Sequence, residues 1–228
     1  MNDILNFTTG PLFSFCLAMA ILGSLRLVII TIADLFRSMK TAGDKKLPWM
    51  DIAIDTASWL FPFNRLFATR RLFSLLSFTF HATLILILIF HQDHILLIRR
   101  IAGISWPFID RPIVDFLAIA CILCAIFLLS NRIFTASGRT MSEAMDYFIL
   151  SLILVVLISG FFASTDFNPF SHGAVLLVHA VCGNLILLLI PFSRLGHMVL
   201  YPILWVASAV AWKFPSDSSN RRGGMVID

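Results

Sequence analysis

The stretch FHATLILILIFHQDH, residues 80–94, places His81 and His91 at the two ends of a nine-residue segment that is mostly apolar. An imidazole inside lipid costs free energy unless another group binds it, so histidines in such a segment indicate either a hydrogen-bond partner or a metal. Apolar runs of the same kind recur along the chain, and they decide the fold class.

The composition is far more apolar than that of a soluble domain. Of 228 residues, 59% are hydrophobic and 13% are charged, and the mean hydropathy is +0.91. Several runs approach the ~20 residues that a helix needs to cross a bilayer, and they lack the strict alternation of barrel strands. We therefore predict an all-α, polytopic membrane helix bundle with five transmembrane helices. The predicted spans are 11–36, 71–98, 112–131, 146–164 and 173–196.

Two further segments are apolar but poorly suited to crossing the membrane. Residues 48–63 carry Asp51 and Asp55 among apolar residues, which favours an interfacial helix. The C-terminal segment 201–228 begins with a short apolar piece and is expected to be interfacial or cytoplasmic. The five-helix membrane domain is thus expected to occupy residues 1–200.

The distribution of Lys and Arg predicts the orientation of the chain. Of the seventeen, thirteen lie in segments expected on one side of the membrane and three on the other. The richer side should be cytoplasmic, which puts the N-terminus outside and the C-terminus in the cytoplasm. The net charge of +4 then reflects topology, and no nucleic-acid partner is expected. The richer side carries Arg37, Lys40, Lys45, Lys46, Arg65, Arg70, Arg71, Arg132, Arg139, Arg194, Lys213, Arg221 and Arg222; the other side carries Arg99, Arg100 and Arg111.

Four histidines fall at two depths on two predicted helices. In the second span His81 lies toward the cytoplasm and His91 toward the exterior, while His179 lies in the outer part of the fifth span and His197 at its inner end. The predicted pairs are His81 with His197 and His91 with His179. Eighteen residues make five turns, which puts His179 and His197 on one helix face, whereas ten residues rotate His91 by about 80° from His81. Pro191 could kink the fifth helix or end it early.

Paired imidazoles at two depths predict two haems b, each held by two axial histidines between helices of a bundle. A haem with both axial positions filled passes electrons without an open site for substrate. The alternative for any single membrane histidine is a hydrogen bond to a neighbouring helix. We expect that simpler role for His94 and His172 near the outer surface, although His172 is the main rival to His179 because it lies seven residues earlier on the same face.

These features make residues 10–200 resemble the gamma subunit of respiratory nitrate reductase. The resemblance is carried by the histidine spacings of ten and eighteen, by five spans with an outer N-terminus, and by PFSRLGH at 191–197. Relatives of that di-haem cytochrome b also occur in membrane redox complexes of sulfate reducers. The resemblance implies an inner haem on His81 and His197, an outer haem on His91 and His179, and a place in the inner (cytoplasmic) membrane.

The resemblance also implies partners. In the family the outer haem adjoins a quinol site, and the inner haem passes electrons to a cytoplasmic iron–sulfur subunit. We therefore expect an electron-transfer subunit of an oxidoreductase complex, with other membrane subunits and with menaquinone or a periplasmic multihaem cytochrome c on the outer side. One position departs from the family: a glycine precedes its outer-haem histidine in the second span, where this chain has Phe90.

Arg26 is a charged residue in the middle of the first predicted span. A buried arginine in lipid requires a partner, and a haem propionate or an acidic residue on another helix would serve, as would snorkelling to the interface. Cys121 and Cys124 lie in a hydrophobic helix without the histidine that a covalent haem attachment motif needs, and we expect them to fill the core.

Two other functions compete with the di-haem cytochrome. A histidine-bearing transporter should show inverted repeats or helices broken near the membrane midplane, and the sequence shows neither convincingly. The function of a haem-free membrane anchor would not require histidines that are paired at two depths.

Overall fold

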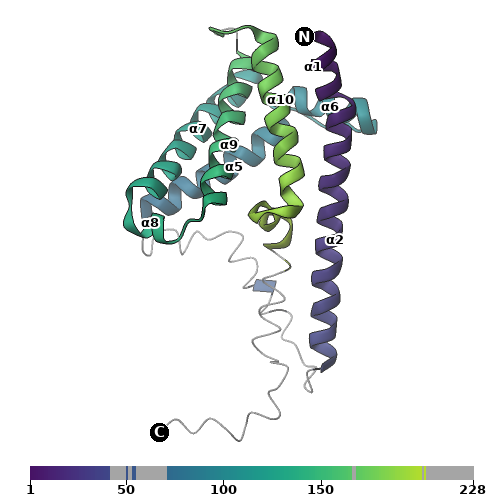
Figure 1. The fold of residues 1–228 in the computed structure, drawn as a ribbon, viewed down its shortest axis with the longest axis vertical. Helices are drawn as coiled ribbons and strands as arrows, with labels where there is room; N and C mark the ends of the chain where they lie inside the picture. The colour runs from purple at the N-terminus through teal and green to yellow at the C-terminus, as the bar shows by residue number, and fades with distance from the viewer. Residues whose placement is uncertain (42–49, 51–52, 55–70, 166–167, 202, 204–228) are drawn as a thin grey trace, which may run out of the picture. The chain divides into compact units, whose positions relative to one another are not determined.

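The computed structural model describes residues 1–41, 50, 53–54, 71–165, 168–201 and 203, and all regular structure in these residues is helical (Figure 1). Two short 3₁₀ helices, Ile190–Phe192 and Arg194–Gly196, follow the α-helix His172–Leu189. The longer elements are α1 (Asn2–Thr9), α2 (Pro11–Thr41), α5 (Arg71–Phe90), α6 (Gln92–Ala102), α7 (Arg111–Phe134), α8 (Ala136–Thr140), α9 (Ala144–Ser164) and α10 (His172–Leu189).

Five helical stretches are long and apolar enough to cross a membrane, which confirms the predicted all-α, five-span, multi-pass membrane protein. Backbone polar groups in lipid must be paired within the segment, and a helix does this along its whole length. The predicted interfacial helix 48–63 and the C-terminal segment 201–228 fall almost entirely outside the described residues. The five stretches are Asn2–Arg37, Arg71–Phe90, Arg111–Phe134, Ala144–Ser164 and His172–Phe192.

The chain divides into two compact units. The first comprises Met1–Ala20 and Leu66–Leu189, and the second comprises Ile21–Arg65 and Ile190–Asp228. Within the first unit each helix contacts the next in the order α5, α7, α9, α10, α1. The helices that carry His91, His94 and His179 all belong to this unit.

Small side chains form the buried face of α7, which packs between α5 and α9. Ala118, Cys121 and Ala125 recur at helical spacing on this face, and Cys121 and Ala125 are completely buried. Small residues let helix backbones approach closely, and in lipid this packing replaces the hydrophobic effect as the force between helices. Cys121 and Cys124 are free thiols, in line with the expected core-filling role.

A buried polar contact holds α1 against α10. Asn184 on α10 donates through Nδ2 to the carbonyl of Thr8 at 2.9 Å, and both residues are buried. The Thr8 hydroxyl in turn donates to the carbonyl of Leu5 at 2.9 Å. Gly10 separates α1 from α2, and a Cβ there would lie 2.8 Å from the carbonyl oxygen of Asn6.

The second span ends earlier than predicted. The sequence prediction carried it to residue 98, but α5 ends at Phe90 and a separate amphipathic helix, α6, follows. The side chain of Trp106 donates to the Ile89 carbonyl at 2.8 Å, and the Ile109 amide donates to the Phe90 carbonyl at 3.1 Å. These donors satisfy carbonyl groups that the end of a helix leaves unpaired, so the chain can turn at residue 91.

The fifth span also ends early, as Pro191 allowed. The α-helical part of α10 stops at Leu189, and the chain continues through two 3₁₀ turns to His197. Pro191 has no amide hydrogen to donate, and Ser193 between the turns is extended, with φ −134° and ψ −175°. The prediction that His179 and His197 share one face of a continuous helix is therefore wrong, because the segment between them is not one α-helix.

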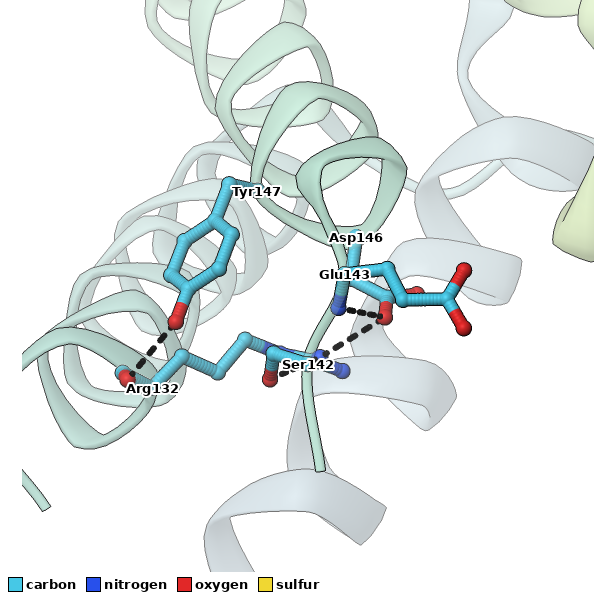
Figure 2. Close-up of polar contacts among 5 residues, drawn as sticks. All are labelled: Arg132, Ser142, Glu143, Asp146 and Tyr147. Carbon is cyan, nitrogen blue, oxygen red and sulfur yellow. Dashed lines mark hydrogen bonds and ion pairs between the residues drawn. The ribbon is translucent and has the colours of Figure 1, made fainter. Parts of the chain in front are cut away.

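A polar clamp closes the hairpin between α7 and α9 (Figure 2). Arg132 donates to the Ser142 hydroxyl at 3.0 Å and lies 3.8 Å from the Asp146 carboxylate, while the Tyr147 hydroxyl donates to the Arg132 carbonyl at 3.1 Å. The same Asp146 carboxylate accepts the amide of Glu143 at 2.9 Å. The clamp fixes the start of α9, whose other end contacts His179.

Candidate functional site

Three imidazoles gather in the first unit, and we call them the histidine cluster: His91, His94 and His179. The ring centroids of His91 and His94 lie 5.0 Å apart with planes inclined by 42°, and those of His94 and His179 lie 6.1 Å apart with planes inclined by only 8°. The corner between α5 and α6 supplies the first two, and the middle of α10 supplies the third. The fold thus brings the predicted partners His91 and His179 to one place, with His94 next to both.

Helix α9 holds the His179 ring in position. Its Nδ1 lies 3.0 Å from the Val156 carbonyl, one turn before Gly160. A Cβ on Gly160 would come within 2.8 Å of Cε1 and 2.9 Å of Nδ1 of this ring. The absence of a side chain at residue 160 is therefore what lets the imidazole lie against the backbone of α9.

The other two rings of the cluster are held by opposite kinds of hydrogen bond. Nδ1 of His94 lies 3.2 Å from the Leu88 carbonyl in the last turn of α5. Nδ1 of His91 instead accepts the backbone amide of Asp93 at 3.2 Å, with His91 in an extended conformation at φ −70° and ψ 130°. His91 is thus the N-cap residue of α6.

Burial favours the neutral form of the two corner histidines, because desolvation lowers the pKa of each. Desolvation lowers the pKa of His91, and the nearby Asp93 carboxylate only partly opposes it. Desolvation also lowers the pKa of His94, helped by the neighbouring His91 and opposed by the Leu88 carbonyl. Neutral imidazole has the free lone pair that binds a metal, so the environment favours the ligating form.

The predicted inner pair lies in two different units. His81, on α5 in the first unit, is exposed, and its Nδ1 lies 2.7 Å from the Ser77 carbonyl. His197, in the second unit, is exposed, and its Nδ1 lies 2.6 Å from the Arg194 carbonyl. The pairing of His81 with His197 stays a prediction.

Arg26 lies where α2 contacts the PFSRLGH segment within the second unit. A Cβ on Gly23 would lie 2.5 Å from the Cβ of Pro191, and a Cβ on Gly196 would lie 3.7 Å from Leu27. Gly23 and Leu27 are one turn apart on α2 and Arg26 lies between them in sequence, with an exposed side chain. Arg26 therefore lies on the same turn of α2 that packs against the segment before His197.

His172 and the histidine cluster differ in their surroundings. His172 is the first residue of α10 and is exposed, whereas His179, two turns later, is half-buried in the cluster. Among the residues that the structure describes, no group of three or more His, Cys, Asp or Glu side chains is arranged to hold a bare metal ion. A haem needs only two axial nitrogens from the protein, and the cluster offers that number from two helices.

Sequence reasoning missed one member of the cluster. His94 was expected near the outer surface without a particular role, because the second span was predicted to run straight on to residue 98. The signal that could have found it is the spacing of HQDH, since two histidines three residues apart lie on one side of a helical turn.

Comparison with known proteins adds one relative. A curated protein of Nitratidesulfovibrio vulgaris, named only "Protein", is 27% identical over 201 residues, which cover 86% of this chain and 87% of that one. No family model matches the chain. No solved structure matches it either.

Proposed function

We propose that this protein is a membrane di-haem cytochrome b that carries electrons as one subunit of a respiratory redox complex. The observation that carries the proposal is the histidine cluster, in which the α5–α6 corner and α10 present imidazoles to one another. The histidine spacing and the resemblance to the nitrate reductase gamma subunit led us to expect His91 and His179 at the outer haem, and both belong to this cluster.

The residues of the cluster fit a haem. When bound, the haem supplies an iron that changes oxidation state by one electron. The chain supplies neutral imidazoles, and the carbonyls of Val156 and Leu88 hold two of these rings by their Nδ1 atoms. A ligand fixed in this way keeps its orientation while the charge on the metal changes. The apolar residues of α5 between His81 and His91 would keep water away from a haem bound at this level.

The second haem of the proposal would be held by His81 and His197, and its support is the spacing of the histidines in the sequence together with the resemblance. Arg26 is proposed as a partner for a haem propionate, since it lies on the turn of α2 that packs against the segment before His197. A charged residue in the middle of a span is otherwise costly.

The setting of the proposal follows from the charge distribution and the resemblance. The chain would lie in the cytoplasmic membrane with its N-terminus outside, and the basic inner segments would dock a cytoplasmic iron–sulfur subunit. A quinone, with menaquinone as the expected type, or a periplasmic multihaem cytochrome c would exchange electrons at the outer haem. Any terminal reaction would belong to the other subunits.

The test is a visible spectrum of the full-length protein purified in detergent, with haem measured per chain. Two b-type haems per chain are expected, resolved as two steps in a redox titration. A protein purified without haem after expression in a haem-replete host refutes the proposal. The exposed His172, changed to Ala, is the matched control and should leave both haems in place.

A further inference from the structure

We propose that the connection between α5 and α7, residues 91–110, lies in the interfacial layer of the membrane. Ile104 and Phe108 reach the acyl chains, and Arg99 lies on the headgroup side. The partner of this surface is therefore lipid. The inference goes beyond the proposed function, because it concerns how the chain fits the bilayer and requires no haem.

The first observation is that the connection stays at the level where two spans end. α5 ends at Phe90 and α7 begins at Arg111, and these two helices pack against each other. The Trp106 indole donates to the Ile89 carbonyl at 2.8 Å. The Ile109 amide donates to the Phe90 carbonyl at 3.1 Å. The chain thus returns twice to the last turn of α5, so the connection is folded back onto the end of that span.

The second observation is the length and direction of α6. Its eleven residues make a helix of about 16 Å, whereas the hydrocarbon core of a bilayer is about 30 Å thick. Within the first unit α6 runs across the direction of α10, which is one of the five spans (Figure 1). A short helix that leaves a span and turns across the direction of another follows the membrane surface, as interfacial helices do.

The third observation is that exposed polar and apolar side chains lie on opposite sides of α6. Gln92 and Ile101 are both exposed, and at 100° per residue they lie about 180° apart around the helix. Arg99 is exposed on the side of Gln92. Within the part of the chain that the structure describes, no hydrogen bond or ion pair engages the Arg99 guanidinium. One side of α6 therefore suits water and lipid phosphates, and the other suits acyl chains.

The fourth observation is the uncovered apolar surface that follows α6. Ile104 is 60% exposed and Phe108 is 53% exposed. Large exposed apolar side chains continue along the sequence into α7, at Ile113 and Phe116, where the span is surrounded by lipid. Water disfavours such a surface, and lipid does not. Because both ends of the connection are ends of spans, the interfacial layer is the medium that lies at this level.

Trp106 fits the same placement. Its ring is half-buried, and its indole N–H is satisfied by the Ile89 carbonyl. Tryptophan is enriched at the boundary between acyl chains and water, where one part of the side chain is apolar and another makes a hydrogen bond. The indole therefore ties the connection to the end of α5 at the depth where Ile104 and Phe108 meet lipid.

The experiment measures the depth of spin labels on single introduced cysteines in the full-length protein, reconstituted in vesicles of phosphatidylcholine and phosphatidylglycerol. Ile104→Cys and Phe108→Cys test the surface, and Gln92→Cys, on the polar side of α6, is the matched control. Accessibility to oxygen and to a water-soluble nickel chelate gives the depth. The labels at residues 104 and 108 are expected about 5–10 Å below the phosphates, and the label at residue 92 in water. Protein without an introduced cysteine gives the background from the half-buried Cys182.

A second measurement uses the chain without a label. Brominated lipid should quench the fluorescence of the wild-type protein more than that of Trp106→Phe. The proposal is overturned if the labels at residues 104 and 108 are as open to the nickel chelate as the label at residue 92. It is also overturned if they are shielded only when another protein binds in native membranes, or if Trp106→Phe leaves the quenching unchanged. A wild-type protein without haem would refute the proposed function and leave this assignment standing.

Discussion

Gly160→Ala is the substitution that most directly tests how α9 holds the His179 ring. The new Cβ would lie 2.8 Å from Cε1 and 2.9 Å from Nδ1 of the imidazole, whereas unstrained contacts between carbon atoms are about 3.5–4.0 Å. The ring must therefore move by somewhat under 1 Å or rotate. Either movement lengthens or breaks the 3.0 Å contact between Nδ1 and the Val156 carbonyl.

The magnitude follows from two opposing effects. Gly→Ala inside a helix normally stabilises by about 1 kcal/mol through reduced backbone entropy. At residue 160 this gain is outweighed by overpacking, typically about 1–3 kcal/mol, together with a lost hydrogen bond of about 1 kcal/mol. We expect a net loss of about 1–2 kcal/mol. The matched control is Gly183→Ala, where a Cβ would meet no atom within 4 Å, and there the stability should hold or rise.

The proposed haem would give a second readout of the same substitution. A hydrogen bond from Nδ1 to a carbonyl makes a ligating imidazole a stronger electron donor, and a stronger donor favours the oxidised metal. Loss of about 1 kcal/mol of that effect raises the one-electron potential by roughly 40 mV, since a tenfold change in the equilibrium constant corresponds to 59 mV for one electron. Thermal unfolding in detergent and a spectroscopic redox titration measure both effects. If Gly160→Ala and Gly183→Ala behave alike in both assays, the contact between α9 and His179 has been misjudged.

Three further substitutions or fusions test the fold around the site. Asp146→Ala removes the carboxylate that caps α9 and faces Arg132, and it should lower the unfolding free energy by about 1–2 kcal/mol. Most of this loss comes from the cap, because an ion pair with an arginine side chain that is 36% exposed contributes little. Asp34→Ala, which breaks the exposed pair with Arg37 at 3.4 Å, should leave the melting temperature unchanged and is its control. Asn184→Ala leaves the buried Thr8 carbonyl without its donor and should cost about 1–3 kcal/mol in thermal unfolding; equal stability to wild type would show that α1 does not depend on this bond. A topology reporter fused after Asp228 should be active only in its cytoplasmic form, given thirteen basic residues on one side and three on the other, and an externally active fusion would reverse the predicted depths of all histidines.

The sequence alone determined the class of the fold, because transfer of side chains into lipid depends on composition over a window of residues. Five long apolar runs were enough to predict five membrane helices, and the predicted third and fourth spans match the structure to within a few residues at both ends. The core-filling role of Cys121 followed from the same local reasoning, since a small thiol in an apolar helix without a metal-binding pattern packs as a small apolar residue.

Helix ends and ring partners were decided by the tertiary structure, because both depend on groups that are distant in sequence. The second span stops at Phe90 partly because Trp106 and Ile109 return to satisfy its last carbonyls, and apolar periodicity does not show that return. The orientation of His179 depends on Gly160 and Val156 of another helix. The spacing of ten residues placed His81 and His91 on one predicted helix, whereas α5 ends at Phe90 and His91 is the N-cap of α6. Residue type and spacing therefore predict that imidazoles will meet, while the helix ends and the contacts with other helices determine how each ring is oriented.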